Sequence, residues 1–345
     1  MMGSGAAARS STSSARLVTR DELEAALARL DDEIARPEAG IFGPDTAVWH
    51  VSRESIVFLG AGRAMLLQLA HPYVAYAIDQ HSNTRADPLA RFRRTFDNIF
   101  AMFFDDLPKA KRSARRVHTV HTHITGHLGE RIGIYRRGQR YRANEVEALL
   151  WVYATLIDTA LMTYEMFVEE LSSEMRERYY RESFRFAALF GLGEDVLPPD
   201  FAAFRAYFEA TVNSGAVVVS QPGREIGRFL LRPRHVALRP SALWFRALTG
   251  TMLPETLREA FGLPGKSRVT QSLVRLSQRL LRWSYARLSP DLRVLPAMLE
   301  AEQRLGVRGE LSARHRRIRG AVIALLERAL ALVGKEGVGR ERAST

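Results

Sequence analysis

The sequence predicts an all-α fold, organised as a single large helical domain. Apolar residues recur at helical spacing in one segment after another, and proline or glycine separates most of these segments. The only β-like run, residues 216–219, is too short to imply a sheet. We therefore expect a disordered polar tail at 1–18, one helical domain at 19–333 and a second polar tail at 334–345.

Helices are predicted along most of this domain. They cover 20–35, 54–80 with a break near His71-Pro72, a segment that begins at Asp87-Pro88, 108–126, 144–171, 173–190 and 199–219, then segments near 241 and 255, 266–288 and 312–332. The Arg-, Pro- and Gly-rich stretch 221–240 is predicted to be an irregular connection. The helix at 144–171 is apolar on nearly every side and should be central, with Asn144 and Glu147 forming a capping-box-like pair at its start.

The composition is that of a soluble globular protein. Hydrophobic residues make up 46% and charged residues 26% of the 345 positions. There is no cysteine, which excludes disulfides, thiolate zinc sites and iron–sulfur clusters. Any metal must therefore be held by histidine, carboxylate or tyrosine side chains.

The chain is strongly basic, with a formal net charge of +12. Such a charge favours an anionic partner, or it reflects arginines spread over solvated helix faces. No arginine-rich arm with interleaved aromatic residues occurs, so we expect no nucleic-acid partner. The most apolar segment, 56–78, is interrupted by Arg63, Gln68 and His71, and we expect no stable membrane insertion. Residues 1–16 lack the apolar core of a secretory signal, which predicts a cytoplasmic protein.

The segment 113–127 contains four histidines, His118, His121, His123 and His127. If it is helical, one apolar arc is formed by Val117, Val120, Ile124 and Leu128. His121 lies about 20° from the edge of this arc, His123 lies among lysines and arginines, and the other two lie at the borders. We therefore expect His121 to be the histidine that points into the core.

Three interpretations of His121 stay open at this point. It is a core residue hydrogen-bonded to a backbone carbonyl, the axial ligand of a haem iron, or part of a zinc or non-haem iron site with His118 at i, i+3. The last of these needs a third ligand, and no carboxylate lies at helical spacing from the pair. On the first interpretation the protein would be a non-catalytic helical binding protein with a basic surface.

A narrow polar stripe interrupts the central helix. Thr155, Asp158 and Thr159 follow i, i+3, i+4 spacing and so lie on one face of a helix that is otherwise apolar. Buried polar groups need hydrogen-bond partners. Either the threonines bond back to helix carbonyls, or the stripe lines a site.

Several short motifs, taken in order, connect residues 50–220 with a known family. They are Leu66–Ala75 (LLQLAHPYVA), His81-Ser82, Asp87–Thr95 (DPLARFRRT), His121 with Gly126 five residues on, Trp151–Thr155 (WVYAT), Tyr164-Glu165 and Tyr179–Glu182 (YYRE). Together they resemble the latex-clearing protein (rubber oxygenase) and mycophenolate-pathway oxygenase family. That family is all-helical and its characterised members bind haem b, so the resemblance implies a haem b oxygenase.

The resemblance also implies roles for individual residues. His121 matches the axial ligand of the haem iron, and Arg91, Thr95 and Thr155 match residues that line the haem pocket. Arg94 stands where rubber oxygenases have a lysine. An arginine stays protonated and cannot ligate iron, so the distal side of the haem should differ from theirs.

Four residues are therefore candidates for catalysis: Arg91, Arg94, Thr95 and His71. We consider His71 as the distal base, with Asp79 and His81 as alternatives. The expected protein is an oxidoreductase that holds haem in a buried pocket, as globins do, and brings dioxygen to a small apolar substrate.

Overall fold

The computed structural model describes residues 15–82, 97–231, 239–265 and 267–307, together with residues 309, 317, 320, 321 and 324. Within these ranges most residues are helical, which confirms the predicted all-α class. The described strands are β1 (Thr125–His127) and β2 (Arg140–Arg142), which pair antiparallel in a small hairpin. The run 216–219 is not a strand.

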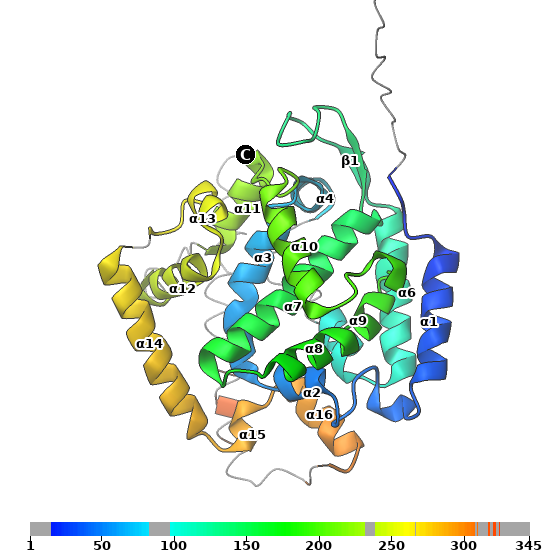
Figure 1. Ribbon diagram of the computed structural model, residues 1–345, viewed down its shortest axis with the longest axis vertical. Helices are drawn as coiled ribbons and strands as arrows, with labels where there is room; N and C mark the ends of the chain where they lie inside the picture. Colours follow the sequence, from blue (N-terminus) through cyan, green and yellow to red (C-terminus); the bar gives the residue numbers. More distant parts are fainter. Residues whose placement is uncertain are drawn as a thin grey trace, which may run out of the picture.

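Helix α7 (Val146–Phe167) runs through the centre of the molecule (Figure 1). It is contacted by η2 (Ser55–Gly60), α3 (Ala61–Leu69), α2 (Ala47–Ser52) and α14 (Arg268–Ala286). Its side chains are buried on most sides, as its composition predicts. By length and hydropathy α7 could cross a membrane, but 72% of its most apolar window is buried inside the protein. A core helix passes the same test, so this is weak evidence for a span.

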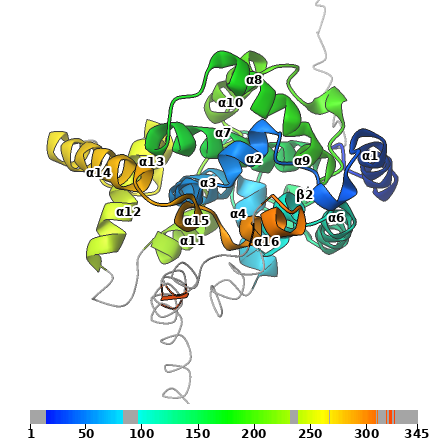
Figure 2. The ribbon, with the colours of Figure 1, turned by 90° about the horizontal axis from the view of Figure 1, so that it is seen from below.

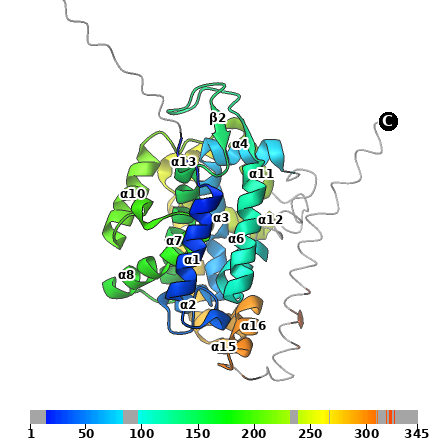
Figure 3. The same cartoon turned by 90° about the vertical axis from the view of Figure 1, so that its right-hand side faces the viewer.

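The remaining elements form a shell around α7. They are α1 (Arg20–Glu33), η1 (Pro37–Ala39), α4 (Pro72–His81), the helical residues 97–104, α6 (Leu107–Thr122), α8 (Ser173–Glu182), α9 (Phe184–Ala188), η3 (Glu194–Val196), α10 (Phe201–Asn213), α11 (Gln221–Leu231), α12 (Arg239–Met252), α13 (Glu255–Ala260), α15 (Pro290–Arg293) and α16 (Pro296–Arg304). Helices α1 and α6 lie side by side along one side of the molecule (Figure 3). Helices α12 and α14 lie on the opposite side (Figure 1).

Helix α1 begins at a complete capping box. The Thr19 side chain accepts a hydrogen bond from the Glu22 amide (3.2 Å), and the Glu22 carboxylate accepts one from the Thr19 amide (2.7 Å). The preceding residue, Val18, is buried, and its amide donates to the carbonyl of Asn144 (2.9 Å). The packed part of the chain therefore includes residues before the predicted start of the domain at 19.

The break predicted at His71-Pro72 is confirmed. Helix α3 ends at Leu69 and α4 begins at Pro72, whose missing amide proton costs nothing in the first turn. His71 is the N-cap, and its Nδ1 accepts a hydrogen bond from the Tyr73 amide (3.3 Å). The two helices can therefore change direction here without an unsatisfied backbone group.

Two local predictions are wrong. The stretch 221–240, expected to be irregular, begins with helix α11, which packs on α3 and α4. Pro222 is tolerated because it lies in the first turn of that helix. The capping box at the start of α7 does not form: the N-cap is Glu145 without a side-chain cap, because the Asn144 amide group instead donates to the carbonyl of His118 (3.3 Å).

Candidate active site

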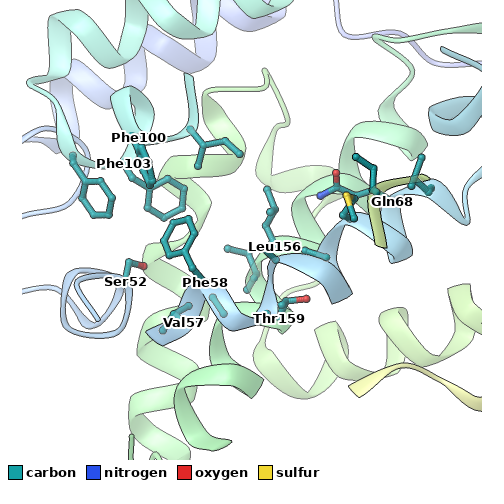
Figure 4. A pocket seen from close by; sticks show the side chains of 18 of the residues that line it. Ser52, Val57, Phe58, Gln68, Phe100, Phe103, Leu156 and Thr159 are labelled. Atoms are coloured by element: carbon teal, nitrogen blue, oxygen red, sulfur yellow. The ribbon is translucent and has the colours of Figure 1, made fainter. Parts of the chain in front are cut away.

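An apolar pocket lies against α7, between η2, α3 and the helical residues 97–104 (Figure 4). Its volume is about 230 Å³, which is below the roughly 300–1,000 Å³ of most ligand pockets. The phenylalanines that line it are Phe58, Phe100, Phe103 and Phe104, and its polar side chains are Ser52, Gln68, Thr159 and Tyr179. Ser52 and Gln68 lie toward opposite ends of the view. The pocket is therefore suited to an apolar molecule with few hydrogen-bonding groups.

Two glycines allow the elements around this pocket to approach one another. A Cβ at Gly60 would collide with the side chains of Thr159 and Thr163 on α7. A Cβ at Gly62 would lie 2.6 Å from Thr249 Oγ1 and 2.9 Å from the Phe245 ring on α12. Both separations are shorter than van der Waals contact, so larger residues would push η2 and α3 away from their neighbours.

The polar stripe of α7 is held by a buried ion cluster. Arg63 of α3 donates to Asp158 Oδ2 (2.6 Å), to Thr159 Oγ1 (2.6 Å) and to the Met252 carbonyl (2.8 Å). The other carboxylate oxygen of Asp158 accepts from Arg205. Burial lowers the pKa of Arg63, while the Asp158 charge opposes that shift, and an arginine stays protonated in either case. The cluster therefore fixes α3, α7 and α10 together.

The sequence leaves open whether the threonines of the stripe bond back to their helix or line a site, and both are true of the stripe. Thr155 is fully buried; its hydroxyl donates to the Val152 carbonyl (2.7 Å) and accepts from Gln68 Nε2 (3.2 Å). Thr159 lines the pocket directly. Thr155 therefore bonds back to its own helix and at the same time holds Gln68, which is part of the pocket wall.

The face of α6 that is buried differs from the predicted arc. Val120 is 53% exposed, and the helix ends at Thr122, so Ile124 and Leu128 lie beyond it. The buried side is formed by Leu107, Ala110, Ser113, Ala114 and His118. The predicted arc is wrong because it continued a helical phase into a segment that leaves the helix to form β1.

The four histidines of this segment have different surroundings. His118, expected at the border of the core, is buried, and its Nε2 pairs with the Val18 carbonyl (3.1 Å). His123 and His127 are exposed, and His123 Nδ1 pairs with the Thr119 carbonyl (2.9 Å). His121 is partly buried in the last turn of α6. His118 therefore has the bonding of a core histidine.

The imidazole of His121 is partly buried, and its pKa is lowered. Burial lowers the pKa of its imidazole to about 4, while a hydrogen bond with the Asn144 side chain opposes that shift. The ring is therefore neutral at pH 7, which metal ligation requires. A ligating histidine usually bonds through its other ring nitrogen to an oriented polar group, and Asn144 supplies such a group. Asn144 is itself oriented by its bond to the His118 carbonyl (3.3 Å).

The two kinds of metal site considered for His121 differ in how many protein ligands they need. A non-haem site needs about three protein ligands, and no group of three histidine or acidic residues placed to hold a metal occurs among the described residues. A haem iron takes four nitrogens from the porphyrin and needs only one axial side chain.

His71 lies in an aromatic cluster formed by Tyr73, Tyr76, Tyr135 and Tyr141. Its Nδ1 accepts from the Tyr73 amide (3.3 Å), so its Nε2 carries the proton and donates to the Tyr135 hydroxyl (3.3 Å). Burial lowers its pKa to about 4. Both ring nitrogens are therefore occupied, and His71 is not among the residues that line the described pocket.

The structure connects Thr155, but not His121, with the described pocket. Arg91, Arg94 and Thr95 lie outside the described residues. Within the described residues, Thr155 contacts the pocket through Gln68, and His121 is held by Asn144 at the end of α6. The prediction missed Asn144 as a partner of His121, because an asparagine before an apolar helix has the pattern of a cap. The sequence does show an apolar face that includes Phe100 and Phe103, but it does not connect that face with Phe58, which is far away in sequence and lines the same pocket.

Most of the chain matches a known protein family. Residues 48–283, well over half of the chain, match the family described as "ER-bound oxygenase mpaB/B'/Rubber oxygenase, catalytic domain". The chain belongs to this oxygenase family. The matched range begins in α2 and ends in α14, so it includes the pocket, His71, His121 and Thr155. No curated protein and no solved structure matches the chain.

Proposed function

We propose that this member of the mpaB/rubber oxygenase family uses haem b, with His121 as the axial ligand of the iron. We further propose that it acts with dioxygen on an apolar substrate held in the pocket beside α7. The observation that carries the proposal is the neutral imidazole of His121, oriented by Asn144 within an oxygenase catalytic domain. The proposal includes a buried haem pocket, as in globins.

Bound haem would supply the binding and activation of dioxygen. The chain would supply the axial nitrogen of His121 and the pocket contacts proposed for Arg91, Thr95 and Thr155. The hydroxyl of Thr155 is held by Gln68 and by its own helix, so it would present a fixed wall rather than a mobile group. Arg94 would contribute a permanent positive charge and no ligand.

The proposal gives His71 a positioning role. It would reach the reaction only through its neighbours, because its two ring nitrogens are bonded to the Tyr73 amide and to the Tyr135 hydroxyl. The candidates for direct catalytic contact are then Arg91, Arg94 and Thr95.

The pocket supports an apolar substrate. Rings of Phe58, Phe100 and Phe103 would exclude water from the space beside α7, and water exclusion strengthens electrostatic interactions at a reacting centre. Thr159 and Gln68 are the polar groups from α7 and α3 that face this space. The Thr159 hydroxyl accepts a hydrogen bond from Arg63, and the Gln68 amide group donates one to Thr155. Both side chains are therefore held in place.

Haem titration of the purified full-length protein tests this proposal. We expect stoichiometric binding with a Soret band and a pyridine haemochrome of type b. His121→Ala should lose stable binding, because the porphyrin would keep only apolar contacts and propionate pairing. The matched controls are His123→Ala and His127→Ala, which remove exposed histidines of the same segment, and His118→Ala, which should lower the melting temperature but keep haem.

Circular dichroism would first establish that each variant is folded. Added imidazole should restore part of the spectrum of His121→Ala by replacing the missing nitrogen. Full haem content with an unchanged Soret maximum in His121→Ala would exclude His121 as the ligand. Loss of haem in His118→Ala alone would assign the iron to the other buried histidine of α6.

A further inference from the structure

Helix α14 exposes a second apolar face to solvent. Its Val269, Leu273, Leu276, Leu280 and Trp283 side chains, which we name the α14 stripe, are 69%, 62%, 54%, 57% and 60% exposed. They recur every three or four residues and fall within an arc of about 80°. The opposite face is formed by Val274 and Tyr285, which are buried in a cluster with residues of α7 and α12. The stripe is therefore additional to the face that attaches α14 to the protein.

The α14 stripe holds much of the exposed apolar surface of the described chain. Ten large apolar side chains are exposed among the described residues, and five of them form this one line. Exposed apolar residues scattered singly are normal, whereas contiguous ones mark an interaction site. Seen from below in Figure 2, α14 projects from the helical body at one edge of the molecule.

The charged residues of α14 beside the stripe are all positive, and the Glu169 carboxylate lies near enough to Arg282 for their charges to interact. Arg268, Arg275, Arg279 and Arg282 are exposed and fall along one flank of the stripe at helical spacing. Arg287 follows the helix, and its guanidinium lies 3.9 Å from the centre of the Trp283 ring. The sequence of α14 contains no aspartate or glutamate. The partner that complements this surface is apolar in its interior and negatively charged at its boundary.

We propose that the α14 stripe docks on an anionic membrane surface, with α14 lying in the plane of the interface. Helices of this type bury an apolar face at the boundary between headgroups and acyl chains and keep basic residues among the lipid phosphates. Tryptophan is favoured at the headgroup level, where Trp283 would lie. The arginines flank one edge of the stripe only; on the other edge, Ser277 accepts a hydrogen bond from Trp244 Nε1 of α12 (3.0 Å). This inference does not depend on the haem assignment.

A second copy of the chain complements the stripe less well. Symmetric pairing of two α14 helices would bring their arginines together without an acidic residue on either helix, and like charges at such an interface are repulsive. Residues 310–345 of the same chain contain more arginine and lysine than aspartate and glutamate, so they too have the wrong sign of charge. An anionic lipid surface meets both the apolar and the electrostatic requirements.

Vesicle co-sedimentation of the full-length protein tests the proposal. The probes are vesicles of phosphatidylcholine alone and vesicles that also contain phosphatidylglycerol. We expect binding to the anionic vesicles that weakens with added salt. Leu276→Ser/Leu280→Ser should weaken this binding by about tenfold or more, because two leucines no longer enter the interface. Arg279→Gln/Arg282→Gln should weaken binding to anionic vesicles several-fold.

The matched control is Ile134→Ser/Val307→Ser, which removes two apolar side chains of similar exposure, 63% and 57%, outside α14. It should bind as the unaltered protein does, and circular dichroism would establish that all variants are folded. The proposal is overturned if the unaltered protein stays in the supernatant with both kinds of vesicle, or if the leucine variant binds normally. It is also overturned if light scattering shows that the unaltered protein is a dimer and that, among the variants, only the leucine variant is a monomer. A second copy of the chain would then cover the stripe.

Discussion

The Asn144 amide group donates to the carbonyl of His118 (3.3 Å), and the same side chain lies close enough to His121, one turn later in the helix, to oppose the lowering of its pKa. A residue at the start of α7 thereby fixes the orientation of a side chain at the end of α6. Such a partner sets which ring nitrogen of a ligating histidine faces the metal. The bond between Asn144 and His121 is therefore the contact through which the fold would control the proposed axial ligand.

Asn144→Ala should weaken haem binding by about 10- to 100-fold, the usual effect of losing a hydrogen bond to a ligating histidine. The measurement is a haem titration followed at the Soret band. Asn213→Ala is the matched control, because Asn213 is an exposed asparagine whose side chain bonds only to the Glu209 carbonyl of its own helix. Equal affinity for haem in the two variants would show that Asn144 does not orient the ligand.

The stability of the protein should fall with acidification because of His71. Its pKa is lowered by burial from 6.5 to about 4. Between these values the unfolded chain takes up a proton that the folded chain does not, so lower pH favours unfolding. His71 should contribute a loss of up to about 1.4 kcal/mol in the free energy of unfolding per pH unit in this range.

The variant His71→Asn tests this pH dependence. Asparagine keeps an N-cap acceptor for the Tyr73 amide but does not titrate. The free energy of unfolding, measured in urea at pH 7 and pH 5, should depend less on pH in the variant than in the unaltered protein. His121 would retain its own contribution, since its pKa is lowered in the same direction. An undiminished pH dependence in His71→Asn would count against a neutral, buried His71.

Asp158→Asn should reduce the free energy of unfolding by about 3–5 kcal/mol, because it leaves a buried guanidinium without its counter-charge. The side chains of Arg63 and Asp158 are 2% and 4% exposed. Glu209→Gln is the control: Glu209 contacts Arg205 of the same cluster but is 68% exposed, so its loss should cost less than about 1 kcal/mol. Chemical denaturation of both variants provides the comparison, and equal losses would show that the Arg63–Asp158 pair is not effectively buried.

Gly60→Ala should destabilise the protein by about 1–3 kcal/mol, as overpacking of a close contact does. The added methyl group would meet Thr159 and Thr163 and push η2 from α7, which alters the wall of the pocket. Gly43→Ala is the matched control, because the nearest atom to its new Cβ lies 3.7 Å away. Thermal melting of the two variants would show whether only the Gly60 substitution is harmful, as the packing requires.

Much of the fold could be predicted from local patterns. Thr19 and Glu22 satisfy the first amide groups of α1, and Pro72 ends one helix and starts the next, because these effects act within a few residues. The central place of α7 follows from its apolar composition, since a helix that is hydrophobic on all sides must be covered. The family resemblance, confirmed over residues 48–283, likewise rests on short motifs visible in the sequence.

The environment of the candidate site could be predicted only in part. The phase of the apolar residues placed His121 next to a buried arc, but the chain leaves the helix after Thr122 to pair Thr125 with Arg142. Such a strand pair depends on residues seventeen positions apart, which helical periodicity does not detect. The face of α6 that packs against its neighbours includes His118 and leaves Val120 exposed.

The sequence by itself determined the helical class, the central apolar helix, the break at His71-Pro72 and the group of histidines in which a ligand would be sought. Only the tertiary structure decided which histidine is held by which partner. His118 is buried because the Val18 carbonyl, 100 residues earlier, reaches its ring, and His121 is oriented because Asn144 bonds both to it and to the helix that carries it. Hydrogen bonds between residues far apart in the chain depend on how whole elements pack, so no local pattern of residues specifies them.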